Sequence, residues 1–181
     1  MERDFPILLA EDDNTVAVAK RAFRQAGLQN PLRVVRDGEQ VIAYLKGDGR
    51  YSDRERYPLP KLVLMGFNIA RRTGLEVLEW IRTQSALKEL PIVMLSASSL
   101  CPETDLQKAR KLGVTAHLTR TPDFKELQHV YKIAVDHWNL LEMRPNRTAG
   151  KLAMRNWPRG QKFCMPPMPR GHVDAMAQNR A

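Results

Sequence analysis

Short apolar runs alternate with amphipathic helical patterns along the first 142 residues, and this alternation constrains the fold more than any other feature. Five largely apolar runs have the length of strands: 5–10, 32–35, 61–65, 91–95 and 114–118. Between them, apolar side chains recur at helical spacing, and short connections join the two patterns. Continuous apolar runs are typical of strands buried on both faces. The sequence therefore predicts an α/β fold in which helices cover both faces of a parallel sheet.

Capping signals mark the starts of three helices. Polar residues that are followed three positions later by Glu or Gln stand at Asp37, Thr73 and Asp123. Such a residue accepts hydrogen bonds from the first free backbone N–H groups of a helix. The stretch 47–60 is instead polar and rich in glycine, proline and charge. We expect it to be an exposed loop between a helix and the third strand.

The end of the chain has a different composition from the rest. Residues 143–181 carry eight Lys or Arg against one Asp, which is +7 of the total net charge of +9. They also hold five of the twelve prolines and show no sustained periodicity. Composition of this kind favours disorder. We therefore expect one domain over residues 1–142, close to neutral, and a disordered basic tail over residues 143–181.

Compartment signals are few. No apolar run approaches the ~20 residues that a membrane-spanning helix needs, and the N-terminus leads almost directly into the first strand, which leaves no room for a signal peptide. Cys101 and Cys164 lie far apart and belong to no metal-spaced cluster. These features predict a reduced, cytoplasmic protein.

Residues with distinctive chemistry stand where the predicted strands end. Glu11 and Asp12 follow the first strand, Gly66 the third, Ser96 the fourth and Arg120 the fifth. In a doubly wound sheet, ligands bind outside the carboxyl ends of the strands, at the point where the strand order reverses. We therefore expect these five residues to line one functional crevice.

The motifs at these strand ends resemble the receiver domain of bacterial two-component response regulators. The matching stretches are 7–13, 35–39, 74–78 and 95–99. The long loop is similar to that of the single-domain branch that partners phytochrome-type and other sensor kinases. The resemblance covers about residues 5–140 and implies a flavodoxin-like, doubly wound sheet of five parallel strands in the order 2-1-3-4-5. It also implies phosphorelay signalling, with a sensor histidine kinase or another signalling protein as partner, and a possible homodimer through helix 4, strand 5 and helix 5.

The resemblance assigns a role to each residue of the crevice. In that family two neighbouring acids bind Mg²⁺, an aspartate that ends the third strand accepts phosphate, and a hydroxyl after the fourth strand contacts the phosphoryl group. By position, Glu11 and Asp12 match the acids and Ser96 matches the hydroxyl. Asn68 stands where the family contributes a backbone carbonyl to the metal. Gly66 occupies the acceptor position itself and has no carboxylate.

Other departures from the family pattern point in the same direction. Arg120 replaces a lysine, Thr121 the proline after it, and Ala70 stands where a proline is usual. Loss of the third carboxylate removes a ligand that Mg²⁺ prefers, and Arg120 adds a permanent cation that could hydrogen-bond the acidic pair. We expect Mg²⁺ binding to be weak or lost, no other cofactor, and an Arg120–carboxylate pair in place of metal and phosphate.

Simpler roles remain open for these residues. The acids at 11–13 could cap a helix, and this is the role expected of Asp13. Ser96 could be a loop hydroxyl that bonds nearby backbone. A hydroxyl nucleophile needs a neighbouring base, and none is evident, so neither Ser96 nor Thr121 is expected to accept phosphate. His117 matches a position where receivers often carry a switching aromatic, but we expect an ordinary residue at the strand edge.

The sequence thus predicts a pseudo-receiver that acts by protein contact and independently of phosphorylation. An enzyme of this fold class is disfavoured because no glycine-rich phosphate loop and no nucleophile–base pair is visible. The alternative is a protein that binds nucleic acid or an anionic surface through its basic tail, with the receiver fold as a scaffold.

Overall fold

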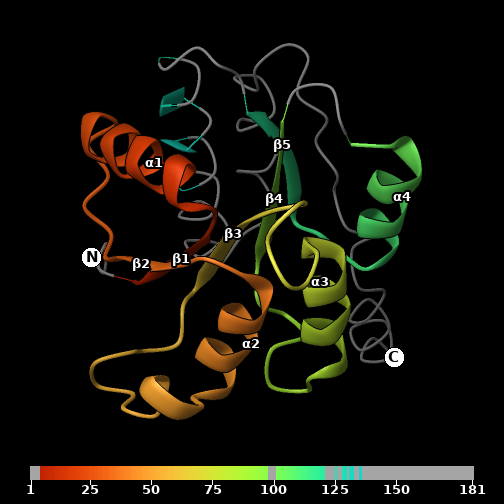
Figure 1. The fold of residues 1–181 in the computed structure, drawn as a ribbon, viewed down its shortest axis with the longest axis horizontal. Helices are drawn as coiled ribbons and strands as arrows, with labels where there is room; N and C mark the ends of the chain where they lie inside the picture. The colour runs from red at the N-terminus through yellow and green to blue at the C-terminus, as the bar shows by residue number, and fades with distance from the viewer. Residues whose placement is uncertain are drawn as a thin grey trace, which may run out of the picture.

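The computed structural model describes residues 5–97 and 101–120, together with six residues of a following helix: Lys125, Gln128, His129, Tyr131, Lys132 and Val135. Within this part of the chain, five parallel strands form one sheet in the order β2-β1-β3-β4-β5 (Figure 1). The strands are β1 (Ile7–Ala10), β2 (Leu32–Val35), β3 (Leu62–Gly66), β4 (Ile92–Ala97) and β5 (Ala116–Arg120). This order confirms the predicted doubly wound fold, with the reversal between β1 and β3.

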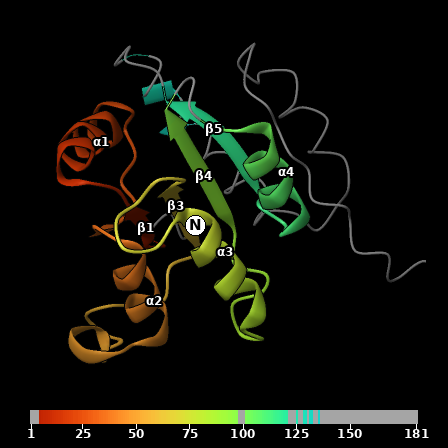
Figure 2. The same cartoon turned by 45° about the vertical axis from the view of Figure 1, so that its right-hand side comes forward.

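Helices cover both faces of the sheet. On one face lies α1 (Asp13–Gln25), together with Tyr131 and Val135; the other face carries α2 (Gly38–Lys46), α3 (Gly74–Thr83) and α4 (Glu103–Lys111). Strand residues alternate between the two cores, so that Leu64 packs on the α1 side and Met65 on the opposite side. Figure 1 shows α1 and α2 on opposite sides of β1 and β2, and in Figure 2 β4 and β5 lie side by side with α4 next to them.

Two of the predicted helix caps are present. Asp37 Oδ1 accepts a hydrogen bond from the Gln40 N–H at 2.8 Å and begins α2. Thr73 begins α3 and forms a reciprocal capping box with Glu76. The Thr73 N–H donates to the Glu76 carboxylate at 2.8 Å, and this bond lowers the pKa of Glu76. The third predicted cap, Asp123, lies outside the described residues.

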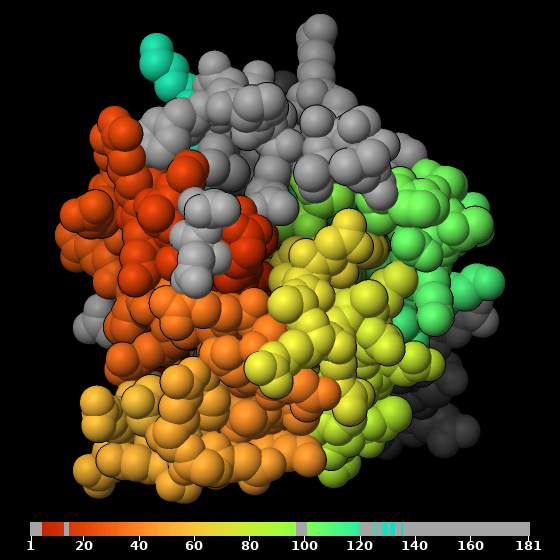
Figure 3. Space-filling model, in the orientation of Figure 1, coloured from red at the N-terminus to blue at the C-terminus, as the bar shows by residue number. Residues whose placement is uncertain are grey.

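The stretch 47–60 is exposed at most positions, as predicted, but it is folded around a buried ring. It contains a turn of 3-10 helix, η1 (Gly49–Tyr51), and Tyr51 packs 5.1 Å from the Tyr44 ring and 5.2 Å from the Tyr57 ring. Arg54 donates to the carbonyls of Tyr44 at 2.9 Å and Leu45 at 2.8 Å, which satisfies the end of α2. In Figure 3 the light-orange residues of this loop form one continuous surface with α2.

The last two strands are displaced from their predicted bounds. β4 continues to Ala97, two residues beyond the predicted end. β5 spans Ala116–Arg120, whereas the predicted strand covered 114–118. The Val114 N–H donates to the Ala109 carbonyl at 3.0 Å, so this residue belongs to the end of the α4 segment. Ser96 and Arg120 are therefore strand residues and do not follow the strands.

Several predictions concern residues that the structure does not describe. These are the basic tail 143–181, Cys164, Thr121 and the Arg120 side chain with its proposed carboxylate pair. Among the described residues, no helix is long and apolar enough to cross a membrane.

Candidate functional site

Gly66 is the last residue of β3, at the carboxyl edge in the middle of the sheet. It is buried and pairs with Leu95 of β4. A Cβ atom added to Gly66 would lie 3.3 Å from Glu11 Oε2 and 3.2 Å from Ile69 Cγ2. Glu11 itself is only 1% exposed. The structure therefore brings Gly66 and Glu11 together, and a side chain at position 66 would face a buried carboxyl group.

The backbone around Gly66 is fixed by the start of α3. A Cβ atom on Gly74 would lie 2.2 Å from the Gly66 carbonyl oxygen, so only glycine permits this approach. The Gly74 N–H donates to the Phe67 carbonyl at 2.8 Å, and the Phe67 N–H donates to the Leu95 carbonyl at 3.0 Å. The geometry of the strand end is thus set by backbone contacts that need no side chain at position 66.

Asp12 caps α1. The Thr15 N–H donates to Asp12 Oδ1 at 3.0 Å, and the Thr15 hydroxyl donates to Oδ2 at 2.9 Å. Both carboxylate oxygens therefore accept hydrogen bonds at the helix start. The sequence left helix capping open for the acids at 11–13 and expected it of Asp13; the structure shows it for Asp12, and the Asp13 side chain lies outside the described part of the chain. The signal was present, because Thr15 stands three residues after Asp12 in the usual capping spacing.

The described donor set is poor in the ligands that Mg²⁺ prefers. Mg²⁺ prefers an octahedral array of oxygen ligands, usually including carboxylates. Glu11 offers a buried carboxylate, Asp12 is engaged by Thr15, and Gly66 offers no side chain. Asn68 is exposed, two residues beyond Gly66. Within the described ranges, no three His, Cys, Asp or Glu side chains form a group that could hold a metal ion.

Ser96 and His117 form a buried hydrogen-bonded pair beside Gly66. The Ser96 Oγ and His117 Nε2 atoms are 2.7 Å apart, and the residues are 6% and 5% exposed. His117 is paired in register with Met94, so this bond runs diagonally from β5 to β4. The Phe67 ring meets the imidazole edge-on at a centroid distance of 5.4 Å.

This pair corrects two expectations. His117 is not an ordinary residue at the strand edge, and a base does lie next to the Ser96 hydroxyl. The two-residue alternation of β4 and β5 places both side chains on the α3–α4 side of the sheet. The sequence missed their contact because it depends on the register between the strands.

The loop after β3 is also fixed to the start of α2. Asp37 and Ala70 form a parallel bridge, and the Gly38 N–H donates to the Ala70 carbonyl at 3.1 Å. Arg71 has a positive φ of 67° and places its Nε 3.4 Å from Asp37 Oδ2. Neighbouring Arg72 pairs with Glu39, and this hydrogen bond raises the pKa of Arg72. Asp37 thus both caps α2 and binds the loop that borders the crevice.

Comparison with known proteins gives matches that agree with this geometry. Residues 7–132 match the model of the response regulator receiver domain. The chain is 31% identical over 122 residues to Response regulator Rcp1 of Synechocystis, covering 67% of this chain and 80% of the relative. It is 30% identical over 141 residues to the probable methanogenesis regulatory protein FilR2 of Methanothrix harundinacea, covering 76% and 85%.

Solved structures give the same result. The phosphorylated cyanobacterial phytochrome response regulator RcpA superposes with a TM-score of 0.69 at 27% identity, over 79% of this chain and 99% of that chain. The Mn²⁺-bound form of Rcp1 superposes with a TM-score of 0.62 at 27% identity, over 79% and 97%. From the family match, the relatives and the sheet order together, the chain belongs to the response regulator receiver domain family of two-component signalling.

Proposed function

We propose that this chain is a response regulator that acts without phosphorylation of the usual position, by contact with other proteins. The observation that carries the proposal is the identity of Gly66. This residue lies at the acceptor position, buried and directed at Glu11, and it has no oxygen that a phosphoryl group could join. Because the carboxylate nucleophile is missing, the acyl phosphate of the family cannot form there.

The Ser96–His117 bond supports a single fixed state. A buried hydrogen bond between two strands holds both side chains in one arrangement, since breaking it would leave polar atoms unpaired. The hydroxyl at position 96 therefore has a partner within the protein and needs no phosphoryl group to orient it. We infer that the β4–β5 half of the crevice presents one surface to partners. An Arg120–carboxylate pair would reinforce this state.

The relatives indicate the class of partner. RcpA is a phytochrome response regulator, so a sensor histidine kinase or another signalling protein of a two-component system is the proposed partner here. A homodimer through α4, β5 and the following helix is a further proposal, as are a cytoplasmic location and the absence of enzymatic activity. Rcp1 has been solved with Mn²⁺. For this chain we propose weak Mg²⁺ binding, for the reasons of ligand number given above.

Incubation with acetyl phosphate and Mg²⁺, followed by intact-mass measurement, tests the proposal. We expect no phosphoryl adduct on the natural chain. The double variant Gly66→Asp, Arg120→Lys restores the carboxylate and the family lysine, and we expect an acid-labile adduct on it. The matched control Gly66→Asn, Arg120→Lys has similar bulk but no carboxylate nucleophile, and it should remain unmodified.

Ser96 offers the sharpest way to contradict the proposal. His117 Nε2 lies 2.7 Å from its hydroxyl, so a nucleophile and a base are adjacent. An acid-stable adduct on the natural chain that is absent from Ser96→Ala would show that phosphorylation has moved to the serine. Phosphorylation independence would then be wrong.

A further inference from the structure

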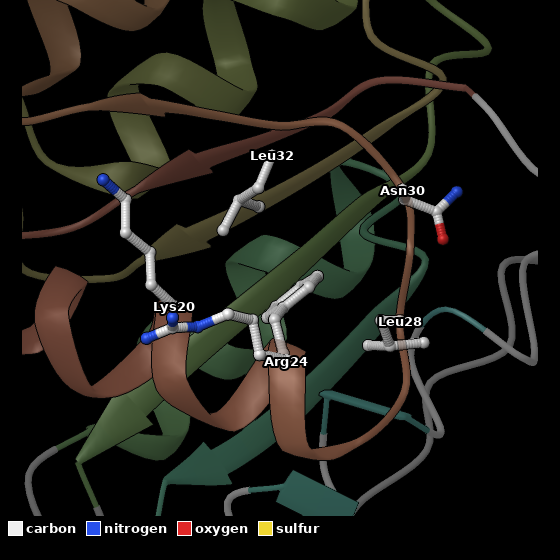
Figure 4. A pocket seen from close by; sticks show the side chains of 6 residues that line it. Lys20, Arg24, Leu28, Asn30 and Leu32 are labelled. Carbon is white, nitrogen blue, oxygen red and sulfur yellow. The ribbon is translucent and has the colours of Figure 1, made fainter.

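A hollow lies between α1 and the start of β2, at the end of the sheet opposite Gly66. Its volume is about 430 Å³, and six residues line it: Lys20, Phe23, Arg24, Leu28, Asn30 and Leu32. Figure 4 shows Lys20 and Arg24 on the side of α1 that faces Leu32, with Leu28 and Asn30 on the connecting loop. Because α1 runs back along the strands, its last turns and the start of β2 mark the amino edge. The hollow is therefore separate from the crevice at the carboxyl edge.

The hollow is basic. Two of its six lining residues, Lys20 and Arg24, carry positive charge and none is acidic, although the domain as a whole is close to neutral. Lys20 and Arg24 are exposed and stand one helical turn apart, where like charges destabilise a helix. Within the described part of the chain, neither makes an ion pair or a side-chain hydrogen bond. An anion between them would remove this repulsion.

The floor of the hollow is apolar. The Phe23 ring is 3% exposed, and Leu28 and Leu32 are partly buried against the same core. A phosphate backbone would gain from the two cations but nothing from this floor. Burial of apolar surface, by contrast, stabilises a complex in proportion to the area removed from water. The occupant that fits both features carries an anionic group beside an apolar side chain.

The neighbouring strand offers backbone groups to such an occupant. β2 is an edge strand, and no described strand pairs with its outer side. The carbonyls of Pro31 and Val35 accept from β1, at 2.9 Å from the Ile7 nitrogen and 3.2 Å from the Glu11 nitrogen. Because backbone direction alternates along a strand, the N–H and C=O groups of Leu32 and Val34 point away from β1. An edge of this kind can pair with an extended peptide.

We propose that the α1–β2 hollow binds an extended acidic segment of a partner protein, in which carboxylate and apolar side chains stand two residues apart and so lie on one face of the segment. The segment pairs with the outer edge of β2, its carboxylates meet Lys20 and Arg24, and an apolar side chain contacts Phe23 and Leu28. The basic tail of this chain and a second copy of the same surface are excluded by their charge, since both are positive. This site does not depend on the residue at position 66.

Fluorescence anisotropy of the full chain tests the proposal. The probe is a labelled peptide of about ten residues in which every second residue is glutamate or leucine, in turn, and the residues between them are serine, so that carboxylate and apolar side chains share one face. We expect saturable binding that weakens on going from about 50 mM to about 500 mM salt. The Lys20→Gln, Arg24→Gln variant should weaken binding about tenfold, and Leu28→Gln should weaken it about threefold. Circular dichroism should show that both variants remain folded.

Three controls decide between the occupants. Lys108→Gln, Lys111→Gln removes two exposed charges from α4 and should leave binding within about twofold. A peptide N-methylated at alternate amides should lose binding, because it cannot pair with the edge. A labelled single-stranded oligonucleotide should bind more weakly than the peptide. Any of three results would overturn the proposal. The two double variants could lose affinity for the peptide equally, or the N-methylated peptide could still bind. The oligonucleotide could also bind more tightly than the peptide, through Lys20 and Arg24.

Discussion

The two halves of the crevice at the carboxyl edge differ in what they retain. In the β1–β3 half, Glu11 is buried, Asp12 caps α1, and Gly66 brings no side-chain oxygen. In the β4–β5 half, Ser96 and His117 remain joined by a buried hydrogen bond. The first half thus has no carboxylate at position 66, whereas the second has a polar link between neighbouring strands.

The backbone at the end of β3 is held by contacts that do not depend on a side chain at position 66. The Gly66 carbonyl is positioned by the close approach of Gly74, and the neighbouring Phe67 N–H donates to β4. None of these contacts involves the carboxylate that the family uses. The strand end can therefore hold its shape without a carboxylate at position 66.

Gly74→Ala should have the largest effect on stability, because it disrupts the close contact between the start of α3 and the end of β3. The new Cβ would lie 2.2 Å from the Gly66 carbonyl oxygen, a backbone atom that cannot move without disturbing β3. We expect the free energy of unfolding to fall by about 3–5 kcal/mol, measured by urea denaturation. As a matched control, Gly27→Ala places a Cβ in open space at a φ of +71° and should cost about 1 kcal/mol. Similar losses in both variants would contradict the close approach.

Gly66→Asp tests the β1–β3 half directly. Its carboxylate would enter next to Glu11 Oε2, which lies 3.3 Å from the added Cβ. In a chelating buffer we expect this variant to be about 2 kcal/mol less stable than Gly66→Asn, which has the same bulk without the charge. Added Mn²⁺ or Mg²⁺ should remove most of this difference, since a cation relieves the repulsion. Equal unfolding midpoints for the two variants in both buffers would show that Glu11 does not face the new side chain.

The fold was predictable because its determinants are local. Apolar runs identified all five strands, and the Asp37 and Thr73 caps identified two helix starts, since capping needs only short sequence separations. The bounds of β5 were wrong because Val114 is apolar and buried, like a strand residue, although its N–H bonds within the α4 segment. Burial alone does not distinguish the two roles.

The proximity of Gly66 and Glu11 was predictable from the sequence, but other contacts at this edge of the sheet were not. Gly66 and Glu11 follow neighbouring parallel strands, so the topology places them together. The Ser96–His117 bond depends instead on the β4–β5 register. The hydrogen bond from Arg54 to the Tyr44 carbonyl depends on how the loop folds back onto α2. Both join residues whose separation in sequence carries no periodic signal.

Ser96→Ala tests the β4–β5 half. Removing the hydroxyl leaves His117 Nε2 without its partner in a buried position, which we expect to cost about 1–2 kcal/mol. His117→Phe keeps a ring against Phe67 and removes the other end of the bond. A double-mutant cycle over these two changes should give a coupling energy of about 1 kcal/mol. Additive effects would mean that the two side chains do not interact, and the proposed fixed state of this half would lose its support.

Thr73→Ala, at the start of α3, should have the smallest effect on stability. Loss of the cap should reduce the free energy of unfolding by about 1 kcal/mol at about pH 7. Hydrogen bonds from Thr73 lower the pKa of Glu76 in the folded protein. The stabilisation that this carboxylate contributes is therefore complete above its ordinary pKa and is lost as pH falls through the lowered value. We expect the difference in free energy of unfolding between the natural chain and Thr73→Ala to become smaller in acid. The control background is Glu76→Gln, which keeps an acceptor oxygen but does not titrate. In that background, the loss of unfolding free energy caused by Thr73→Ala should not change with pH. If this loss becomes smaller in acid there as well, the pH dependence comes from another group.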